Sequence, residues 1–134
     1  MLISLSLVAL MVFGFVGTAY AAEFPKGETI PASTTVDDDV FLSGENVVVD
    51  GTVNGVLFAA GQTVTVNGTV NGDAFLAGES IVVSDTAVIT GNLFTGAAEI
   101  TINGSVGGSI FGGSSAMDLE SKAKVARNMF YGGF

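Results

Sequence analysis

The chain has 134 residues, with 13 acidic residues against 4 Lys and Arg, and it contains no His, Cys or Trp. The absence of His and Cys excludes a Ser-His-Asp triad, a thiol nucleophile, a Cys/His zinc site and disulfides. A net charge of −9 argues against nucleic-acid binding, which needs clustered Lys and Arg to neutralise phosphates. Because 49% of the residues are hydrophobic, the composition is typical of a folded domain rather than a disordered chain.

Residues 1–22 form a segment that differs in composition from the rest of the chain. No charged side chain occurs in residues 2–22, and an apolar run over residues 5–16 leads to the small residues Ala19 and Ala21. This order is typical of a signal peptide cleaved after position 21 or 22, although no Lys or Arg precedes the apolar run. A retained N-terminal membrane anchor is the alternative. Under either interpretation we expect the remainder to be exported to the extracytoplasmic cell envelope.

The remainder of the chain is repetitive, and six Phe residues follow one another at steps of 17, 17, 19, 17 and 19 residues. They are Phe41, Phe58, Phe75, Phe94, Phe111 and Phe130. Five positions before each Phe stands a β-branched residue: Val36, Val53, Val70, Ile89, Val106 and Val125. A second aliphatic column contains Ile30, Val47, Val64, Ile81, Ile100 and Met117, and a third contains Ala32, Val49, Val66, Val83, Ile102 and Leu119. Such a repeat predicts that each column stacks as one ladder.

Within each repeat, aliphatic residues alternate with other residues at a period of two, which predicts strands rather than helices. Short turns recur in one column, as at Asp50-Gly51 and Asn67-Gly68, where Gly permits positive φ at little cost. A hairpin meander gives no reason for one fixed column of turns, whereas coils stacked about 4.8 Å apart require it. We therefore expect an all-β chain that folds as a single-stranded β-solenoid. Its six coils of 17–19 residues span residues 30–134, after a lead segment over residues 23–29.

The two longer steps have a local cause. Two extra residues are inserted at the same corner of the repeat, once before Ile89 and once before Val125. A left-handed solenoid of hexapeptide repeats is the competing fold, but it needs 18 residues per coil, and steps of 17 and 19 do not keep that phase. The acyltransferases built on the hexapeptide fold also usually rely on a His base, which this sequence lacks.

The repeats resemble those of the bactofilins, a family of polymer-forming cytoskeletal proteins. Val49-Asp50-Gly51-Thr52-Val53-Asn54-Gly55 and Val66-Asn67-Gly68-Thr69-Val70-Asn71-Gly72-Asp73 read much like the V-x-G-x-V-x-G-D-h repeat of that family. The resemblance covers residues 27–134. It implies a right-handed, roughly triangular parallel β-helix of about six coils, and assembly into filaments through the coil ends without nucleotide. The apolar N-terminal segment makes the chain most similar to exported, membrane-associated relatives.

The acidic run Asp37-Asp38-Asp39 has three interpretations. Clustered carboxylates suit a cation site or a catalytic acid and base. The residues aligned with Asp37 in later coils are Asn54, Asn71, Thr90 and Gly107. This polar column favours a solvated corner of stacked side chains. Carbohydrate-active β-helix enzymes place their carboxylates between long loops, and the 17/19 register leaves no room for such loops. We therefore expect a protein that is not an enzyme and has no catalytic, metal or cofactor residues.

The Phe column has two alternative orientations. The residues on either side of each Phe are mostly aliphatic and compensate in size, as Leu57 does with Ala59 and Ala74 with Leu76. If both flanks point inward, the pleat turns Phe outward, whereas hydrophobicity alone favours Phe in the core. We expect the outward orientation. It creates an apolar stripe of about 24 Å, which is a candidate contact for a lateral partner, a membrane or another envelope component.

The last coil is the predicted assembly interface, because a solenoid ends in an unpaired layer of strands with an exposed section of core. Its residues are Met117, Leu119, Val125, Met129, Phe130 and Tyr131. Residues 23–115 carry 11 acids and one base, whereas residues 116–134 carry two acids and three bases. Electrostatic repulsion should therefore oppose side-by-side association of the acidic body more strongly than it opposes contact between the last coils of two copies. We expect a structural protein that associates end to end with copies of itself. The alternative is a monomeric, surface-displayed solenoid that serves as a binding module or stalk.

Overall fold

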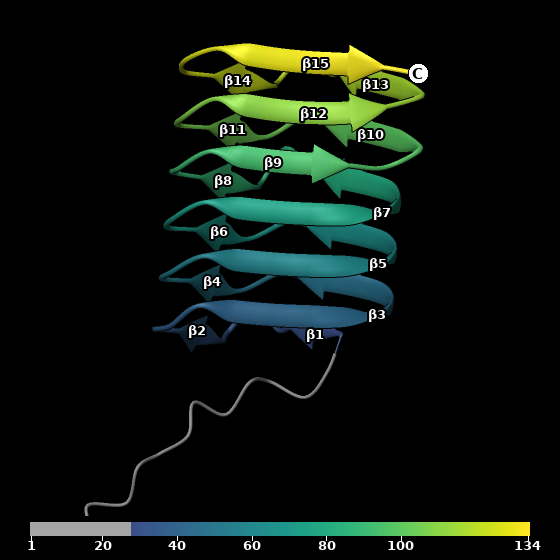
Figure 1. The fold of residues 1–134 in the computed structure, drawn as a ribbon. Helices are drawn as coiled ribbons and strands as arrows, with labels where there is room; N and C mark the ends of the chain where they lie inside the picture. The colour runs from purple at the N-terminus through teal and green to yellow at the C-terminus, as the bar shows by residue number, and fades with distance from the viewer. Residues whose placement is uncertain (1–27) are drawn as a thin grey trace, which may run out of the picture.

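The structure is a computed structural model that describes residues 28–134, and the predicted signal peptide and most of the lead segment lie outside the described residues. The described chain is all-β and contains no helix. It winds as a β-solenoid of about six coils, in which every strand pair is parallel. In Figure 1 the front strands run from left to right while the chain climbs from bottom to top, so the coil is right-handed. The predicted fold class is confirmed.

Two sheets run along the solenoid. The larger sheet has nine strands, which are β1 (Thr29–Ile30), β3 (Val40–Val49), β5 (Leu57–Val66), β7 (Ala74–Val83), β9 (Leu93–Gly96), β10 (Glu99–Ile102), β12 (Ile110–Ser114), β13 (Ala116–Leu119) and β15 (Met129–Gly133). The smaller sheet has six two-residue strands, which are β2 (Thr35–Val36), β4 (Thr52–Val53), β6 (Thr69–Val70), β8 (Val88–Ile89), β11 (Ser105–Val106) and β14 (Lys124–Val125). Strand β1 begins one residue before the predicted start of the solenoid domain.

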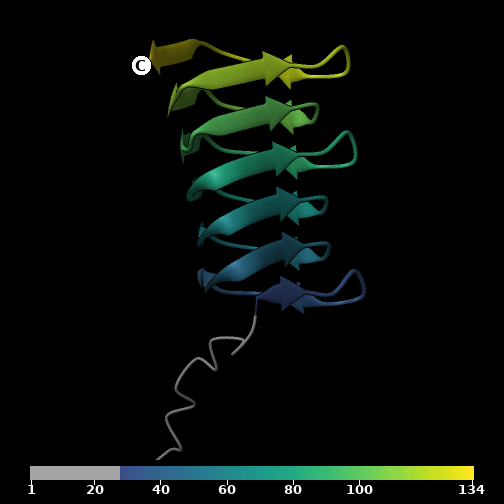
Figure 2. The same ribbon diagram turned by 90° about the vertical axis from the view of Figure 1, so that its right-hand side faces the viewer.

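Each long strand serves two faces of the coil. In β3 the buried positions are Val40 and Leu42 and then Val47 and Val49, so the inward side changes parity near Gly44. The strand bends there, and Figure 2 shows the long strands curving round one edge of the molecule. Together with the two-residue strands, the two halves give three faces that surround a narrow core of aliphatic side chains.

The structure confirms the first predicted ladder. Val36, Val53, Val70, Ile89, Val106 and Val125 pair in register across the smaller sheet. The second ladder is confirmed from Val47 through Val64, Ile81 and Ile100 to Met117. The third is confirmed from Val49 to Leu119.

The predicted place of Ile30 at the base of the second ladder is wrong. Ile30 pairs with Val49 and so belongs to the third ladder, while Ala32, which was predicted there, is exposed. The cause is a third long corner. The chain takes five residues from Ile30 to Thr35, as it does from Val83 to Val88, whereas the short corner takes three. Backbone N–H groups close these longer corners with turns, as Thr34 donates to Pro31 at 2.9 Å, and the three corners project in Figure 2.

The turn glycines do not use the positive φ that Gly permits, since the described residues include no Gly with positive φ. The structure gives these glycines another role, which is close approach of stacked backbones. A Cβ added at Gly68 would overlap the carbonyl oxygen of Gly51 in the coil below, and one at Gly104 would lie 2.6 Å from that of Ser84. Any larger residue would therefore push two coils apart at the corner.

Replacing Gly68 with Ala should therefore lower the free energy of unfolding by about 1–3 kcal/mol, because the obstacle is backbone that cannot rotate away. Gly96→Ala is the matched control: nothing lies within 4 Å of an added Cβ there, and the change should stay within about 0.5 kcal/mol. Urea unfolding followed by circular dichroism measures both. Equal stabilities of the two variants would refute the close-approach role.

Polar side chains form short ladders at the corners. The Asn54 Nδ2 donates to the Asp37 carboxylate at 2.6 Å, and the Asn71 Nδ2 donates to the Asn54 side-chain oxygen at 2.8 Å. The side-chain oxygens of Asp39, Asp73 and Asn92 instead accept backbone N–H groups from the next coil at 2.7–2.8 Å. The acidic run therefore participates in stacking at a corner, as its column indicated.

One buried polar group is left without a partner among the described residues. The hydroxyl of Thr95, which occupies the inward column of Leu42, Ala59 and Leu76, makes no hydrogen bond. A buried hydroxyl with no acceptor loses its hydration without compensation.

Thr95→Val should therefore raise the free energy of unfolding by about 1 kcal/mol, because it replaces an unsatisfied hydroxyl with a methyl group of similar size. Thr95→Ser keeps the hydroxyl and removes the methyl, so it should lower the stability by about 0.8 kcal/mol. Thermal melts of the two variants beside the parent distinguish these effects. A Val variant less stable than the parent would show that the hydroxyl is satisfied in solution.

Candidate functional site

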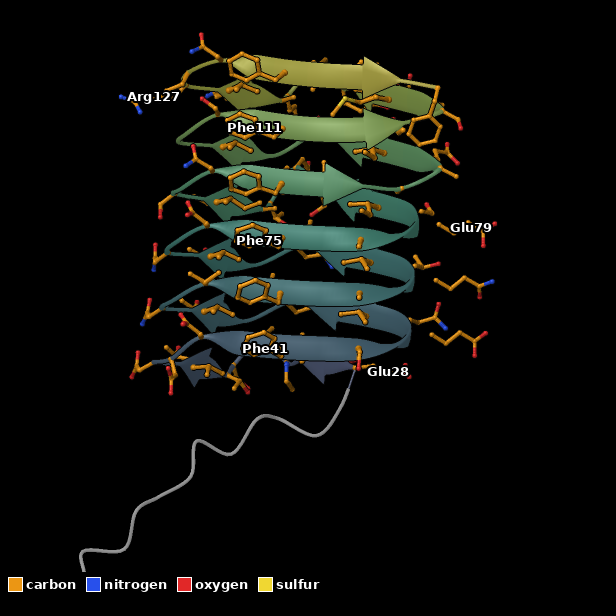
Figure 3. All side chains as sticks on the ribbon, viewed as in Figure 1. Glu28, Phe41, Phe75, Glu79, Phe111 and Arg127 are labelled. Carbon is orange, nitrogen blue, oxygen red and sulfur yellow. The ribbon has the colours of Figure 1, made fainter. Side chains whose placement is uncertain are left out.

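The six Phe side chains form one continuous stack on the outside of the solenoid, which we call the Phe ladder. Phe41, Phe58, Phe75, Phe94, Phe111 and Phe130 pair in register on neighbouring strands. Their ring centroids lie 4.5–5.1 Å apart, and neighbouring ring planes differ by 2–8°. Figure 3 shows the rings above one another along the front of the molecule, at Phe41, Phe75 and Phe111.

The ladder faces solvent while its flanks face the core. Leu57 and Ala59 are buried on either side of the half-buried Phe58, and Ala74 and Leu76 are buried beside Phe75, which is 36% exposed. Phe130 in the last coil is 54% exposed. The two residues that flank each Phe compensate in size because both fill the same space in the core. The outward orientation of the Phe side chains agrees with the orientation expected from the sequence.

A groove runs beside the Phe ladder. Two positions after each Phe stands a small outward residue: Ser43, Ala60, Ala77, Gly96, Gly113 and Gly132. Over the first four coils of the ladder, these residues and the rings line an open groove of about 620 Å³. No charged side chain lines it. We call this feature the small-residue groove; it was visible in the sequence as a column of Ser, Ala and Gly but was not predicted as a site.

The last coil brings the predicted interface residues to one end of the molecule. Leu119, Met129 and Tyr131 are 48%, 39% and 43% exposed, although the residues below them, Ile102, Ile110 and Gly112, belong to inward columns. Met117 and Val125 are half-buried and pack against the core. The section of core at this end is therefore apolar and exposed.

The first coil is different. Ile30, Val40 and Leu42 are all at most 3% exposed. Glu28 holds the start of the solenoid, since its carboxylate accepts the backbone N–H of Glu45 at 3.1 Å and its carbonyl accepts that of Val48 at 2.8 Å. The two ends of the described chain thus present different surfaces, of which the C-terminal one is the more apolar.

Charge is distributed unevenly along the solenoid. Residues 28–115 carry ten acidic and no basic side chains, whereas residues 116–134 carry two acidic and three basic ones.

In the described chain one salt bridge forms, between the Lys122 Nζ and the Asp85 carboxylate at 2.8 Å. The hydrogen bond and charge of Lys122 lower the pKa of Asp85, and the same contact raises the pKa of Lys122. Both groups are exposed, so the pair adds little to stability.

The described residues contain no cluster of three or more acidic side chains placed to hold a metal ion. Residues 28–134 include no helix long and apolar enough to cross a membrane. The described residues instead form two apolar surfaces. One is the Phe ladder with its groove along one face, and the other is the exposed section of core at the C-terminal end.

No family model, curated protein or solved structure matches the chain.

Proposed function

We propose that the chain is a structural, self-assembling β-solenoid protein of the cell envelope, which associates end to end through its terminal coils without nucleotide. The observation that carries the proposal is the exposed core at the last coil, where Leu119, Met129 and Tyr131 are each 39–48% exposed. Burying side chains of this kind that are already half covered contributes roughly 1 kcal/mol each. The resemblance to bactofilins supports the same mode of assembly.

Unpaired strand edges support the proposal independently of hydrophobicity. Strands β14 and β15 lie at the ends of their sheets, so each has one neighbouring strand in the described chain. Their outer N–H and C=O groups form an edge that another chain can extend. Two C-terminal coils that meet as like ends would complete both sheets and cover both exposed core sections at once.

Filament growth needs a second contact. Strands β1 and β2 lie at the opposite ends of the two sheets, so a like-end contact there would join dimers into a filament without polarity. The C-terminal contact forms first in this scheme, because its surface is the more apolar and the two acids and three bases of residues 116–134 nearly balance.

Met129→Lys should weaken end-to-end association by about tenfold or more, because a symmetric contact would bury two unpaired charges. Thr65→Lys is the control, since Thr65 points outward in the middle of the solenoid. Sedimentation velocity of the purified full chain over a range of protein and salt concentrations measures the effect, and electron microscopy shows the assemblies. Addition of ATP or GTP should change nothing.

Phe130→Asp should also shorten the assemblies, but it alters the Phe ladder as well as the end, so Met129→Lys is the cleaner variant. A parent chain that stays monomeric at high concentration across all salt conditions would overturn the proposal. The monomeric stalk or binding module would then take its place.

A further inference from the structure

The face that carries the Phe ladder is a ridge beside a groove over the first four coils of the ladder, and the two columns of residues that form them run parallel through all six coils. Along each strand the ring and the small residue are two positions apart, as in Phe58 and Ala60, which separates their columns by about 7 Å. Both columns repeat with the coil spacing of about 4.8 Å. The two columns therefore have one period and equal length.

We propose that this face binds a second copy of the same chain, with the Phe ladder of each copy seated in the small-residue groove of the other. A two-fold axis parallel to the solenoid axis achieves this. It exchanges left and right as the two faces meet, so each ridge comes to lie over the opposite groove. A two-fold axis parallel to the strands would instead place ridge on ridge and groove on groove. The surface is thus self-complementary in the parallel arrangement, as a two-fold contact requires.

The repeat itself favours a copy of this chain over another kind of partner. Each ring of the partner must lie opposite a small residue at the same position along the solenoid axis. A second solenoid with the same coil spacing meets this condition at every coil. The inner rings have a neighbour on each side within 5.1 Å, so no sugar or nucleobase can insert between two of them.

Charge disfavours a lipid surface as the occupant. The strand segment of the ladder is bounded in the first coils by acidic side chains, Asp39 before Val40 and Glu45 after Gly44. Residues 28–115 contain no Lys or Arg that could bind an anionic headgroup. The same acids repel a second copy at low salt, so lateral pairing should strengthen as salt screens them.

The size of the face sets the strength of the contact. A stripe about 24 Å long and 14 Å wide buries on the order of 400 Å² per copy, or 800 Å² in total. That total lies below the 1,200 Å² of ordinary stable interfaces, so a single pair is weak. The inference does not depend on end-to-end assembly, although copies already joined at their ends would multiply the contact.

The first test fills the groove. Ala60→Gln places a long side chain in the path of the partner's rings, and Thr65→Gln places the same side chain on another outward position of β5. Both are made in a chain that also carries Met129→Lys, so that end-to-end contact does not contribute. Sedimentation equilibrium should show a dimer that strengthens with salt, is weakened at least about tenfold by Ala60→Gln, and is unchanged by Thr65→Gln.

The second test fixes the arrangement. The natural chain has no Cys, so single introduced cysteines are unique. A mixture of Phe58→Cys and Ala60→Cys chains should form the mixed disulfide dimer in excess over either homodimer. Disulfides that are no more frequent in the mixture than in each variant alone would overturn the ridge-in-groove contact. So would a chain that stays monomeric up to millimolar concentration at high salt, or one in which Ala60→Gln abolishes binding to phosphatidylcholine vesicles instead of dimerisation.

Discussion

The constraint on which this molecule depends is the stacking of identical positions at the spacing of parallel strands. Backbone N–H and C=O groups of neighbouring coils pair with one another, as where the Asp50 N–H donates to the Ile30 carbonyl and the Asn67 N–H donates to the Val49 carbonyl. Every side chain is then held within about 5 Å of its equivalent above and below. A column accordingly tolerates only residues that stack on one another: aliphatic side chains inside, amides and carboxylates that bond in series at the corners, and rings that lie parallel on the face. Glycine occupies the corner positions where two backbones meet without room for a Cβ.

The narrow core explains why six aromatic residues lie outside. The inward columns on either side of the ladder share one space, and a large residue in one is matched by a small residue in the other. Six rings added to that space would have to displace Leu, Ile and Val side chains that are already fully buried. On the outer face the same rings stack on one another, so part of their apolar surface is removed from water without help from the core. What remains exposed at the ladder edge and at the last coil is the apolar surface that the proposed assembly would bury.

The stacked columns could be predicted from the sequence because the Phe in each repeat marks the register of its coil. It misplaced Ile30 because no Phe precedes the first corner, so the two extra residues between Ile30 and Thr35 were read as part of a regular coil. The role of the turn glycines was missed for a different reason. Close approach between coils is a property of stacked backbones, and the residue pattern of one turn does not distinguish it from positive φ. The small-residue groove corresponds to the column of Ser, Ala and Gly that follows each Phe by two positions. This column could not be recognised as a groove from the sequence, because small residues line a groove only where the neighbouring rings point outward.

The equal length of the second and third coils has a consequence for how such a protein changes over generations. Residues 50–66 and 67–83 each contribute one complete turn, and they agree column by column, so a genetic deletion or duplication of 17 codons leaves every remaining side chain with an equivalent neighbour. Loss of residues 50–66 would join Val49 to Asn67, which stands in the column of Asp50 and is followed by the same Gly-Thr-Val. The length of the rod is therefore an inherited variable with a fixed increment of about 4.8 Å. Both ends are carried over unchanged, the aromatic face gains or loses one ring with each coil, and unequal recombination is sufficient to adjust the span of the molecule.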